Sequence, residues 1–216
     1  MKIALDGVDI HYRIEGSGDP ALVMHGGLGA DHTCFVNTGF RKLSSMLELV
    51  LYDHRCNGRS SSPDIKTLTH ENLSSDAEKL RTRLGYNEVT VIGHSYGGII
   101  GLEYALRYPS NIRRLILVTT TPSGDCLSEA RKIAMNRAPH LIKTVDNLLT
   151  GKCANDKEFI ELLTTLAPLY FKNYSLFEKE FAEAAKDISG AVNLPLFLLE
   201  GVAIIALVVC ILAVVG

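Results

Sequence analysis

Ser95 lies in a segment whose residue types and spacing could present a nucleophile. The apolar run Val89–Ile92 leads into residues 93–97, Gly-His-Ser-Tyr-Gly, and a helix-forming segment begins at Ile99. A serine at a sharp turn between strand and helix has a strained backbone, and the flanking glycines remove Cβ atoms that would collide with neighbouring chain. The hydroxyl is then exposed at the positive end of the helix, where it can attack a carbonyl carbon. The segment therefore predicts a nucleophile at Ser95, with an ordinary Gly/Ser turn as the alternative and a structural role for His94.

A second segment, residues 25–29 with the sequence His-Gly-Gly-Leu-Gly, could bind the negative charge that such an attack creates. A glycine-rich loop leaves backbone N–H groups free, and one of them can bind an oxyanion together with the N–H of the residue after the nucleophile. The predicted donors are therefore the backbone N–H groups of Gly27 and Tyr96, with Leu28 as the alternative to Gly27. A phosphate-binding loop would need a G-x-G-x-x-G pattern or a Walker lysine, and the segment has neither. His25 is expected to brace the loop through hydrogen bonds.

Residues 53–60, Asp-His-Arg-Cys-Asn-Gly-Arg-Ser, form a third polar segment directly after the predicted strand Leu47–Tyr52. The segment is rich in turn-forming and charged residues, which predicts a loop at the same edge of the sheet. Taken alone, it indicates no particular reaction.

In this order and spacing, the three segments resemble the α/β-hydrolase superfamily, in particular its proline-iminopeptidase-like members. The resemblance is close from Lys2 to Ser123 and looser in the helical segment that follows. It implies an α/β-hydrolase fold with a helical cap, an oxyanion hole in the first loop and an acyl intermediate on Ser95. It also implies a small-molecule or peptide substrate, with no metal and no cofactor. The residues expected to support the site are His25, Gly26, Asp53 and Arg55.

Three features depart from that family's pattern. Cys56 stands where the family's loop normally has glycine, and Leu28 where the oxyanion loop often has proline. Cys56 would strain its turn if the backbone there requires a positive φ. The third departure concerns the acid of the triad, which the family places shortly after the strand that matches Leu194–Leu199. Here that place falls near Ala203 or Ile204, and both are apolar.

Neither the acid nor the histidine of the triad is identifiable. The last histidine, His140, lies in the predicted cap and is expected to be a partly solvated surface group. Asp125 follows the predicted strand Arg114–Thr119, where some relatives place their acid, but an acid without its histidine activates nothing. The leading hypothesis is a serine hydrolase or aminopeptidase for a small amide or ester, impaired by the loss of these two residues. The alternative is a non-catalytic α/β-hydrolase-like protein that binds a small ligand or a partner.

An aminopeptidase would also need a group that meets the free amine of its substrate. Cap carboxylates are candidates, although a solvated helix face explains each of them as well. These residues are Glu158, Glu161, Glu178 and Glu180.

Apolar runs alternate with helical patterns in the first part of the chain, which predicts a mostly parallel, doubly wound sheet covered on both faces. Asp6-Gly7 predicts a hairpin turn, Thr69 a helix N-cap, and Gly85 the end of that helix. The other predicted elements are the strands Ile3–Leu5, Val8–Glu15, Ala21–Met24 and the helix Ile99–Tyr108.

Three parts are expected along the chain: an α/β-hydrolase core at 1–122, a helical cap at 123–190, and residues 191–216. The last part is expected to hold a seventh strand that runs into an apolar tail, in which only Cys210 is polar between Gly201 and Gly216. This tail permits three readings: a membrane anchor, unrelated sequence after a frameshift or truncation, or a buried helix. The second is preferred, so the fold is expected to be truncated at its C-terminal end.

The overall composition narrows the class of protein. The 216 residues carry a formal net charge of −2 and no run of Lys or Arg, which argues against a nucleic-acid partner. The five cysteines are scattered without a C-x-x-C pair, so neither a zinc ribbon nor a disulfide framework is expected. This usage fits a reducing, cytoplasmic compartment, with a membrane anchor through residues 201–216 as the alternative. The sequence does not indicate an oligomeric state.

Overall fold

The computed structural model describes residues 1–27, 30–36, 39–61, 63–122, 126–149 and 156–169, with residues 171, 173–176, 178, 179 and 182. The strands are β1 (Lys2–Leu5), β2 (Val8–Glu15), β3 (Asp19–Met24), β4 (Leu47–Tyr52), β5 (Val89–His94) and β6 (Ile112–Val118). The α-helices are α1 (Thr33–Val36), α2 (His70–Arg83), α3 (Tyr96–Arg107), α4 (Cys126–Arg137), α5 (Ile142–Leu149) and α6 (Asp156–Leu166). Short 3-10 helices are η1 (Gly39–Ser45), η2 (Ile65–Thr67), η3 (Pro109–Asn111), η4 (Pro139–Leu141), η5 (Ala167–Leu169) and η6 (Tyr174–Leu176).

The six described strands form one sheet in the order β1-β2-β4-β3-β5-β6. β1 and β2 pair antiparallel, as do β2 and β4, whereas β4, β3, β5 and β6 run parallel. Parallel neighbours require crossover connections, and α1 with η1, α2 and α3 provide them. The carboxyl ends of the parallel strands therefore meet at one edge of the sheet. This is the mostly parallel, doubly wound sheet that the sequence predicted.

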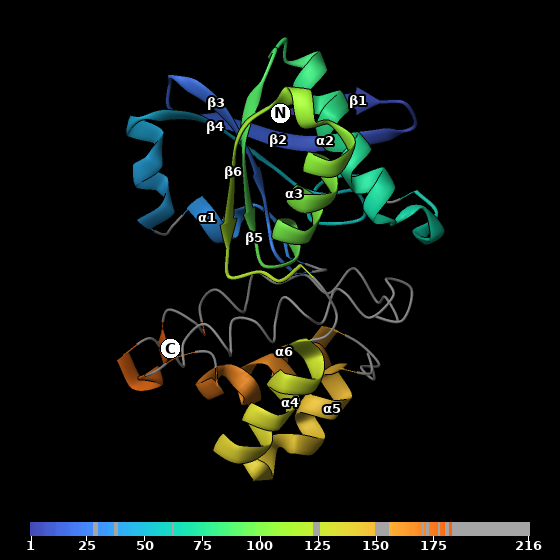
Figure 1. The fold of residues 1–216 in the computed structure, drawn as a ribbon. Helices are drawn as coiled ribbons and strands as arrows, with labels where there is room; N and C mark the ends of the chain where they lie inside the picture. Colours follow the sequence, from blue (N-terminus) through green and yellow to red (C-terminus); the bar gives the residue numbers. More distant parts are fainter. Residues whose placement is uncertain are drawn as a thin grey trace.

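Both faces of the sheet are buried at the central strands β3, β4 and β5, whereas the edge strand β6 is largely exposed. Successive side chains of a strand point to opposite sides, so each central strand contributes to both cores. The helices α2 and α3 lie on one side of the strands and α1 on the other (Figure 1). The core under α2 and α3 includes Leu22, Met24, Val50, Tyr52, Val91, Leu73, Ala77, Leu80, Ile100 and Tyr104. The core on the opposite face includes Ala21, Val23, Leu49, Leu51, Ile92 and Phe35.

The turn and cap residues behave as their types predict. Asp6 and Gly7 have φ values of 37° and 92°, as a two-residue hairpin between β1 and β2 requires. The Thr69 hydroxyl accepts a hydrogen bond from the backbone N–H of Asn72 at 3.1 Å, which caps the start of α2. Gly85, with φ of 80°, follows the end of this helix.

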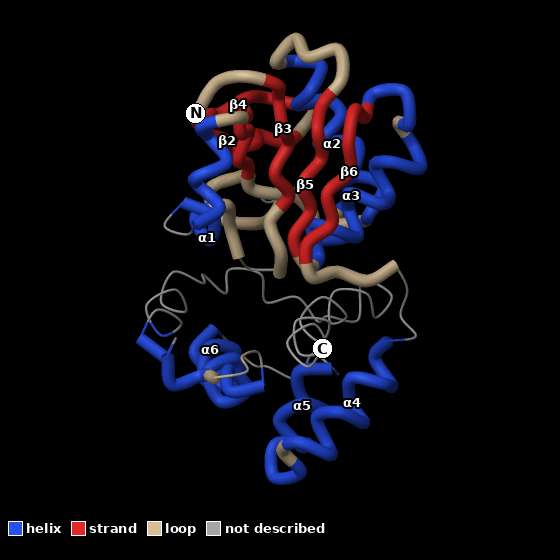
Figure 2. The backbone as a smooth tube through the Cα atoms, turned by 60° about the vertical axis from the view of Figure 1, so that its left-hand side comes forward, coloured by secondary structure: helices blue, strands red, loops and turns tan. Residues whose placement is uncertain are grey.

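The helices α4, α5 and α6 lie beyond the edge of the sheet toward which β5 and β6 run (Figure 1 and Figure 2). They have a small apolar core of their own, which comprises Ala134, Ala138, Val145, Leu162, Leu166 and Leu169. From Cys126 on, the segment after β6 is mostly helical where it is described. The domain boundaries at 122/123 and 190/191 stay predictions.

Several predicted helix and strand limits were wrong. β3 begins at Asp19 rather than Ala21, and β6 spans Ile112–Val118 rather than Arg114–Thr119. α3 begins at Tyr96 rather than Ile99, although glycines at 97 and 98 disfavour a helix, because tertiary packing there outweighs propensity. β5 likewise continues through Gly93 to His94 rather than ending at Ile92. The predicted seventh strand, Leu194–Leu199, and the tail at 201–216 lie outside the described residues. Within the described ranges, no helix combines the length and hydropathy needed to cross a bilayer.

Candidate active site

Ser95 occupies the single residue between β5 and α3, in a backbone conformation that L-amino acids rarely adopt. Its φ is 58° and its ψ is −122°. Strain of this kind costs about 1–3 kcal/mol and persists only where surrounding contacts impose it. Here the Ser95 N–H donates to Val118 O at 2.9 Å, and its carbonyl accepts from Gly98 N–H at 3.0 Å and from Thr120 Oγ1 at 2.7 Å. The end of β6 thus holds the turn in place.

The glycines around Ser95 are required by close backbone contacts. A Cβ on Gly93 would lie 2.5 Å from Gly97 O, and a Cβ on Gly97 would lie 2.1 Å from Met24 O. Both contacts are with backbone atoms, which cannot move aside as a flexible side chain can. The turn therefore brings α3 against the end of β3 only because these positions lack side chains.

The Ser95 side chain is 6% exposed and makes no capping hydrogen bond to α3. Its hydroxyl is therefore not committed to the helix that it precedes. Tyr96 is the first residue of α3, so its N–H has no acceptor in a preceding helical turn, and the positive end of the helix dipole lies here. The position combines a hydroxyl with backbone donors and a favourable field for negative charge.

The glycine loop after β3 lies directly against this turn. A Cβ on Gly26 would lie 2.7 Å from Ser95 Cβ and 2.9 Å from His94 Nδ1. Gly27 follows with a φ of 64°, a value that suits glycine. The structure thus brings the predicted donor segment and Ser95 together, whereas Leu28 lies outside the described residues. Such an arrangement can hold a carbonyl oxygen beside a serine hydroxyl.

His25 braces this loop as a neutral imidazole. Its Nδ1–H donates to Gly26 O at 3.0 Å, and its Nε2 accepts from the His54 N–H at 3.1 Å. His54 returns the contact, since its Nε2–H donates to His25 O at 3.3 Å. Burial lowers the pKa of His25, and burial together with the neighbouring His25 lowers that of His54 well below the usual value. Burial, then His25, also lowers the pKa of His94.

Asp53 forms a second link between the loop after β4 and the segment after β3. Its Oδ1 accepts from the His32 N–H at 3.0 Å and from His32 Nδ1 at 2.5 Å, and its Oδ2 accepts from the Arg59 N–H at 2.9 Å. Burial acts to raise the pKa of Asp53, but the hydrogen bonds from His32 and Arg59 outweigh it and hold that pKa well below its usual value. Asp53 is thus an ionised acceptor that fastens the far end of the 25–32 segment.

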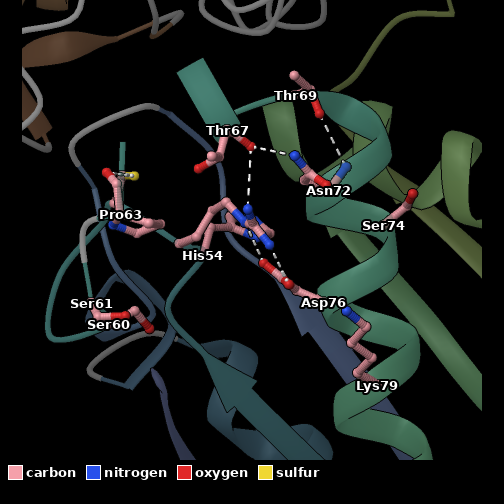
Figure 3. Close-up of polar contacts among 12 residues, drawn as sticks. His54, Ser60, Ser61, Pro63, Thr67, Thr69, Asn72, Ser74, Asp76 and Lys79 are labelled. Atoms are coloured by element: carbon pink, nitrogen blue, oxygen red, sulfur yellow. Dashed lines mark hydrogen bonds and ion pairs between the residues drawn. The ribbon is translucent and has the colours of Figure 1, made fainter. Parts of the chain in front are cut away.

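Arg55 forms a fork with Asp76, whose side chain projects from α2 (Figure 3). Its Nε and Nη2 donate to the two carboxylate oxygens at 2.6 Å each, and its Nη1 donates to Thr67 O at 3.3 Å. Both side chains are buried, which makes this pair the anchor of the 53–60 loop on α2.

Cys56 has a φ of 62° and is buried, so the residue that replaces the family's glycine does occupy a left-handed position. The strain expected from the sequence is therefore present in the turn. Its thiol lies 3.9 Å from Pro63 O, a weak contact.

Other candidates from the sequence lie elsewhere. His140 is exposed in η4, among the helices beyond the sheet. Glu158, Glu161 and Glu178 are exposed, and Glu161 pairs with Lys157 at 3.9 Å. The positions named for the acid and for the last cap carboxylate, Asp125, Ala203, Ile204 and Glu180, lie outside the described residues.

Two histidines that lie beside Asp53 were not predicted as neighbours of it from the sequence. His32 forms the hydrogen bonds described above, and His11 Nδ1 on β2 lies 3.3 Å from Asp53 Oδ2. Burial lowers the pKa of His11, against the raising effect of Asp53. Local spacing gave no signal for either contact, because the three residues come from separate segments.

Comparisons with known proteins agree with this geometry. A family model described as alpha/beta hydrolase fold matches residues 20–150. The proline iminopeptidase PfmaB of Pestalotiopsis fici is 29% identical over 180 residues, 80% of this chain and 63% of that protein. The putative carbamate hydrolase RutD of Azorhizobium caulinodans is 31% identical over 139 residues, 61% of this chain and 50% of that protein. This chain therefore spans less than two-thirds of the length of either relative.

Among solved structures, a variant of the meta-cleavage product hydrolase CumD from Pseudomonas fluorescens superposes with a TM-score of 0.66 at 19% identity. The match covers 94% of this chain and 66% of that structure. At this identity the likeness concerns the fold.

Proposed function

Because this chain belongs to the α/β-hydrolase family, we propose that it hydrolyses a small amide or ester through an acyl intermediate on Ser95. The observation that supports this most is the strained Ser95 with Gly26 packed against it, since the arrangement needs three glycines and several backbone hydrogen bonds to exist. Backbone strain of this size is expected where a serine hydroxyl has to be held in reach of a substrate.

In the proposed reaction, Ser95 Oγ attacks the substrate's carbonyl carbon and loses its proton to a base. The carbonyl oxygen becomes an oxyanion, which the backbone N–H groups of Gly27 and Tyr96 stabilise. Collapse of this intermediate expels the amine or alcohol and leaves the acyl-serine, which water then hydrolyses. Ser95 is thus the proposed nucleophile, and Gly27 and Tyr96 are the proposed donors. No residue is proposed as the base or as its acid.

The substrate class follows from the relatives and is part of the proposal. Proline iminopeptidases and a putative carbamate hydrolase are among them, so amides of small amino acids and simple esters are the substrates to test first. A small-molecule or peptide partner and a cytoplasmic location belong to the same proposal, the latter supported by the free thiols of Cys34 and Cys56.

The test compares turnover of a chromogenic ester and of proline p-nitroanilide by the natural chain, Ser95→Ala and Ser110→Ala. Ser110 is an exposed serine outside the site and serves as the matched control. We expect Ser95→Ala to lower turnover by about 10³-fold or more, and a fluorophosphonate to label Ser95 alone. Equal turnover by the natural chain and Ser95→Ala would refute the proposal.

The second candidate is a non-catalytic binding protein of the same fold. The apolar residues Ala203 and Ile204, at the place where the family has its acid, favour it. Absence of turnover and labelling, with retained binding of a product-like ligand, would support this alternative.

A further inference from the structure

Three side chains of types that can bind a metal ion meet beside the carboxyl end of β4. They are His11 on β2, His32 in the segment after β3, and Asp53 directly after β4. The two imidazole nitrogens and a carboxylate oxygen all lie within 4.8 Å of one another. His32 and Asp53 are fully buried, whereas the His11 side chain is 14% exposed and borders solvent.

The fold itself fixes this convergence. β2 and β4 pair with Tyr12 opposite Tyr52, and the pairing continues because the Asp53 N–H donates to His11 O at 2.9 Å. His11 and Asp53 are therefore opposite one another across two neighbouring strands. The His32 N–H, bound to Asp53 Oδ1 at 3.0 Å, brings in the third side chain, and the His11 and His32 rings stack at 5.3 Å.

One nitrogen of this cluster is not satisfied by the protein. His11 Nδ1 is buried, yet within the described part of the chain it makes no hydrogen bond, and its nearest acidic neighbour is Asp53 Oδ2 at 3.3 Å. A buried polar atom without a partner calls for an explanation, such as a bound ion. The 3.3 Å separation also suits two ligands of one ion, because ligand bonds of about 2.0–2.2 Å in tetrahedral geometry place donor atoms about 3.3–3.6 Å apart.

The His32–Asp53 contact is shorter, at 2.5 Å, and is that of a hydrogen bond. Binding of an ion would replace the Nδ1 proton and lengthen this contact. The neighbouring charges are Asp31, whose Cβ lies beside Gly58 together with Asp53 Oδ2, the exposed Arg59 and the N-terminal ammonium. The buried Asp53 carboxylate therefore attracts a cation, whereas the positive charge of Arg59 at the exposed rim of the cluster repels it.

We propose that His11, His32 and Asp53 bind one divalent transition-metal ion of the zinc class. Two imidazoles and a carboxylate are the donors that such ions prefer, whereas Mg²⁺ and Ca²⁺ prefer oxygen alone. The ion ties β2 to the segments after β3 and β4, and a water completes its coordination on the solvent side of His11. This inference does not depend on Ser95 acting as a nucleophile.

The test is zinc binding by the full chain after dialysis against a chelator, measured by competition with a chromophoric zinc indicator. We expect one Zn²⁺ per chain and a rise in melting temperature that grows with zinc concentration. His11→Gln and His32→Gln should each lower the affinity by about 100-fold or more. His140→Gln removes an exposed histidine outside the cluster and should leave the affinity unchanged.

Cobalt substitution separates this site from the free thiols of Cys34 and Cys56. Visible bands without a thiolate-to-cobalt charge-transfer band are the expected result, and His11→Gln should abolish them. If His32→Gln fails to fold, the zinc affinity and the cobalt bands of His11→Gln, a change at a more exposed side chain, decide whether the cluster binds the ion. A stoichiometry near zero, an affinity insensitive to His11→Gln, or a thiolate band would overturn the proposal.

Discussion

Replacing Asp76 by asparagine should destabilise the protein strongly, because it removes the charge that neutralises a buried guanidinium. Arg55 is 8% exposed and Asp76 2%, and two hydrogen bonds of 2.6 Å join them. Breaking a buried ion pair in this way costs about 3–5 kcal/mol. Arg55 keeps its contact with Thr67 O, so we expect the lower end, about 3 kcal/mol.

The assay is urea unfolding followed by circular dichroism, with thermal unfolding as a second measure. In a chain of this size, a loss of about 3 kcal/mol corresponds to a decrease of about 6–12 °C in melting temperature. The matched control is Asp146→Asn, since Asp146 forms the same fork with Arg131, at 2.6 and 2.9 Å, on the solvent-exposed side of α4 and α5. It should leave the melting temperature nearly unchanged, because exposed ion pairs contribute little.

A double variant, Arg55→Met with Asp76→Leu, tests the reason for the loss. It removes both charges together, so it should be less destabilised than Asp76→Asn alone. Equal effects of Asp76→Asn and Asp146→Asn would refute the argument that burial makes the Arg55 pair important.

Three further predictions concern the turns and the buried histidines. Gly97→Ala should not yield native protein, because its Cβ would lie 2.1 Å from Met24 O; soluble protein with an unchanged near-UV spectrum would contradict this. Cys56→Gly should be more stable to urea than Cys56→Ala by about 1 kcal/mol, because only glycine relieves the positive φ; a more stable alanine variant would show that the turn is unstrained. Burial keeps His25 and His94 neutral in the folded state, so stability should be constant above about pH 6.5. Below that pH only the unfolded chain gains protons there, so the free energy of unfolding should fall with decreasing pH by up to about 1.4 kcal/mol per pH unit for each histidine, and the urea midpoint with it; a midpoint that rises on acidification would reverse the assignment.

The sequence predicts the central sheet well, because its strands are uninterrupted apolar runs between turn-forming residues. Leu47–Tyr52 is a strand with the predicted limits, and the hairpin at Asp6-Gly7 is present. Short helices were harder to predict. α1 has four residues and no helical period, yet its Phe35 covers one face of the sheet through tertiary contacts.

The residues of the candidate site also differ in how far the sequence predicts them. Ser95 and Gly26 could be found from local patterns, because a strained turn and a close contact require particular residue types at fixed spacing. The cluster of His11, His32 and Asp53 could not, since it depends on strand register and on a backbone hydrogen bond between loops. Long-range pairing of this kind has no local sequence period.

The contacts that hold Ser95 also set a limit on exchanging the helices beyond the sheet. The Ser95 N–H donates to Val118 O at the end of β6, and the Ser95 carbonyl accepts from Thr120 Oγ1 in the segment that follows β6. A chimaera that carries another protein's cap keeps these bonds when the junction follows Thr121, and loses the threonine's bond when the junction precedes Thr120. The junction point, more than the identity of the grafted helices, would then decide whether the serine keeps its backbone conformation.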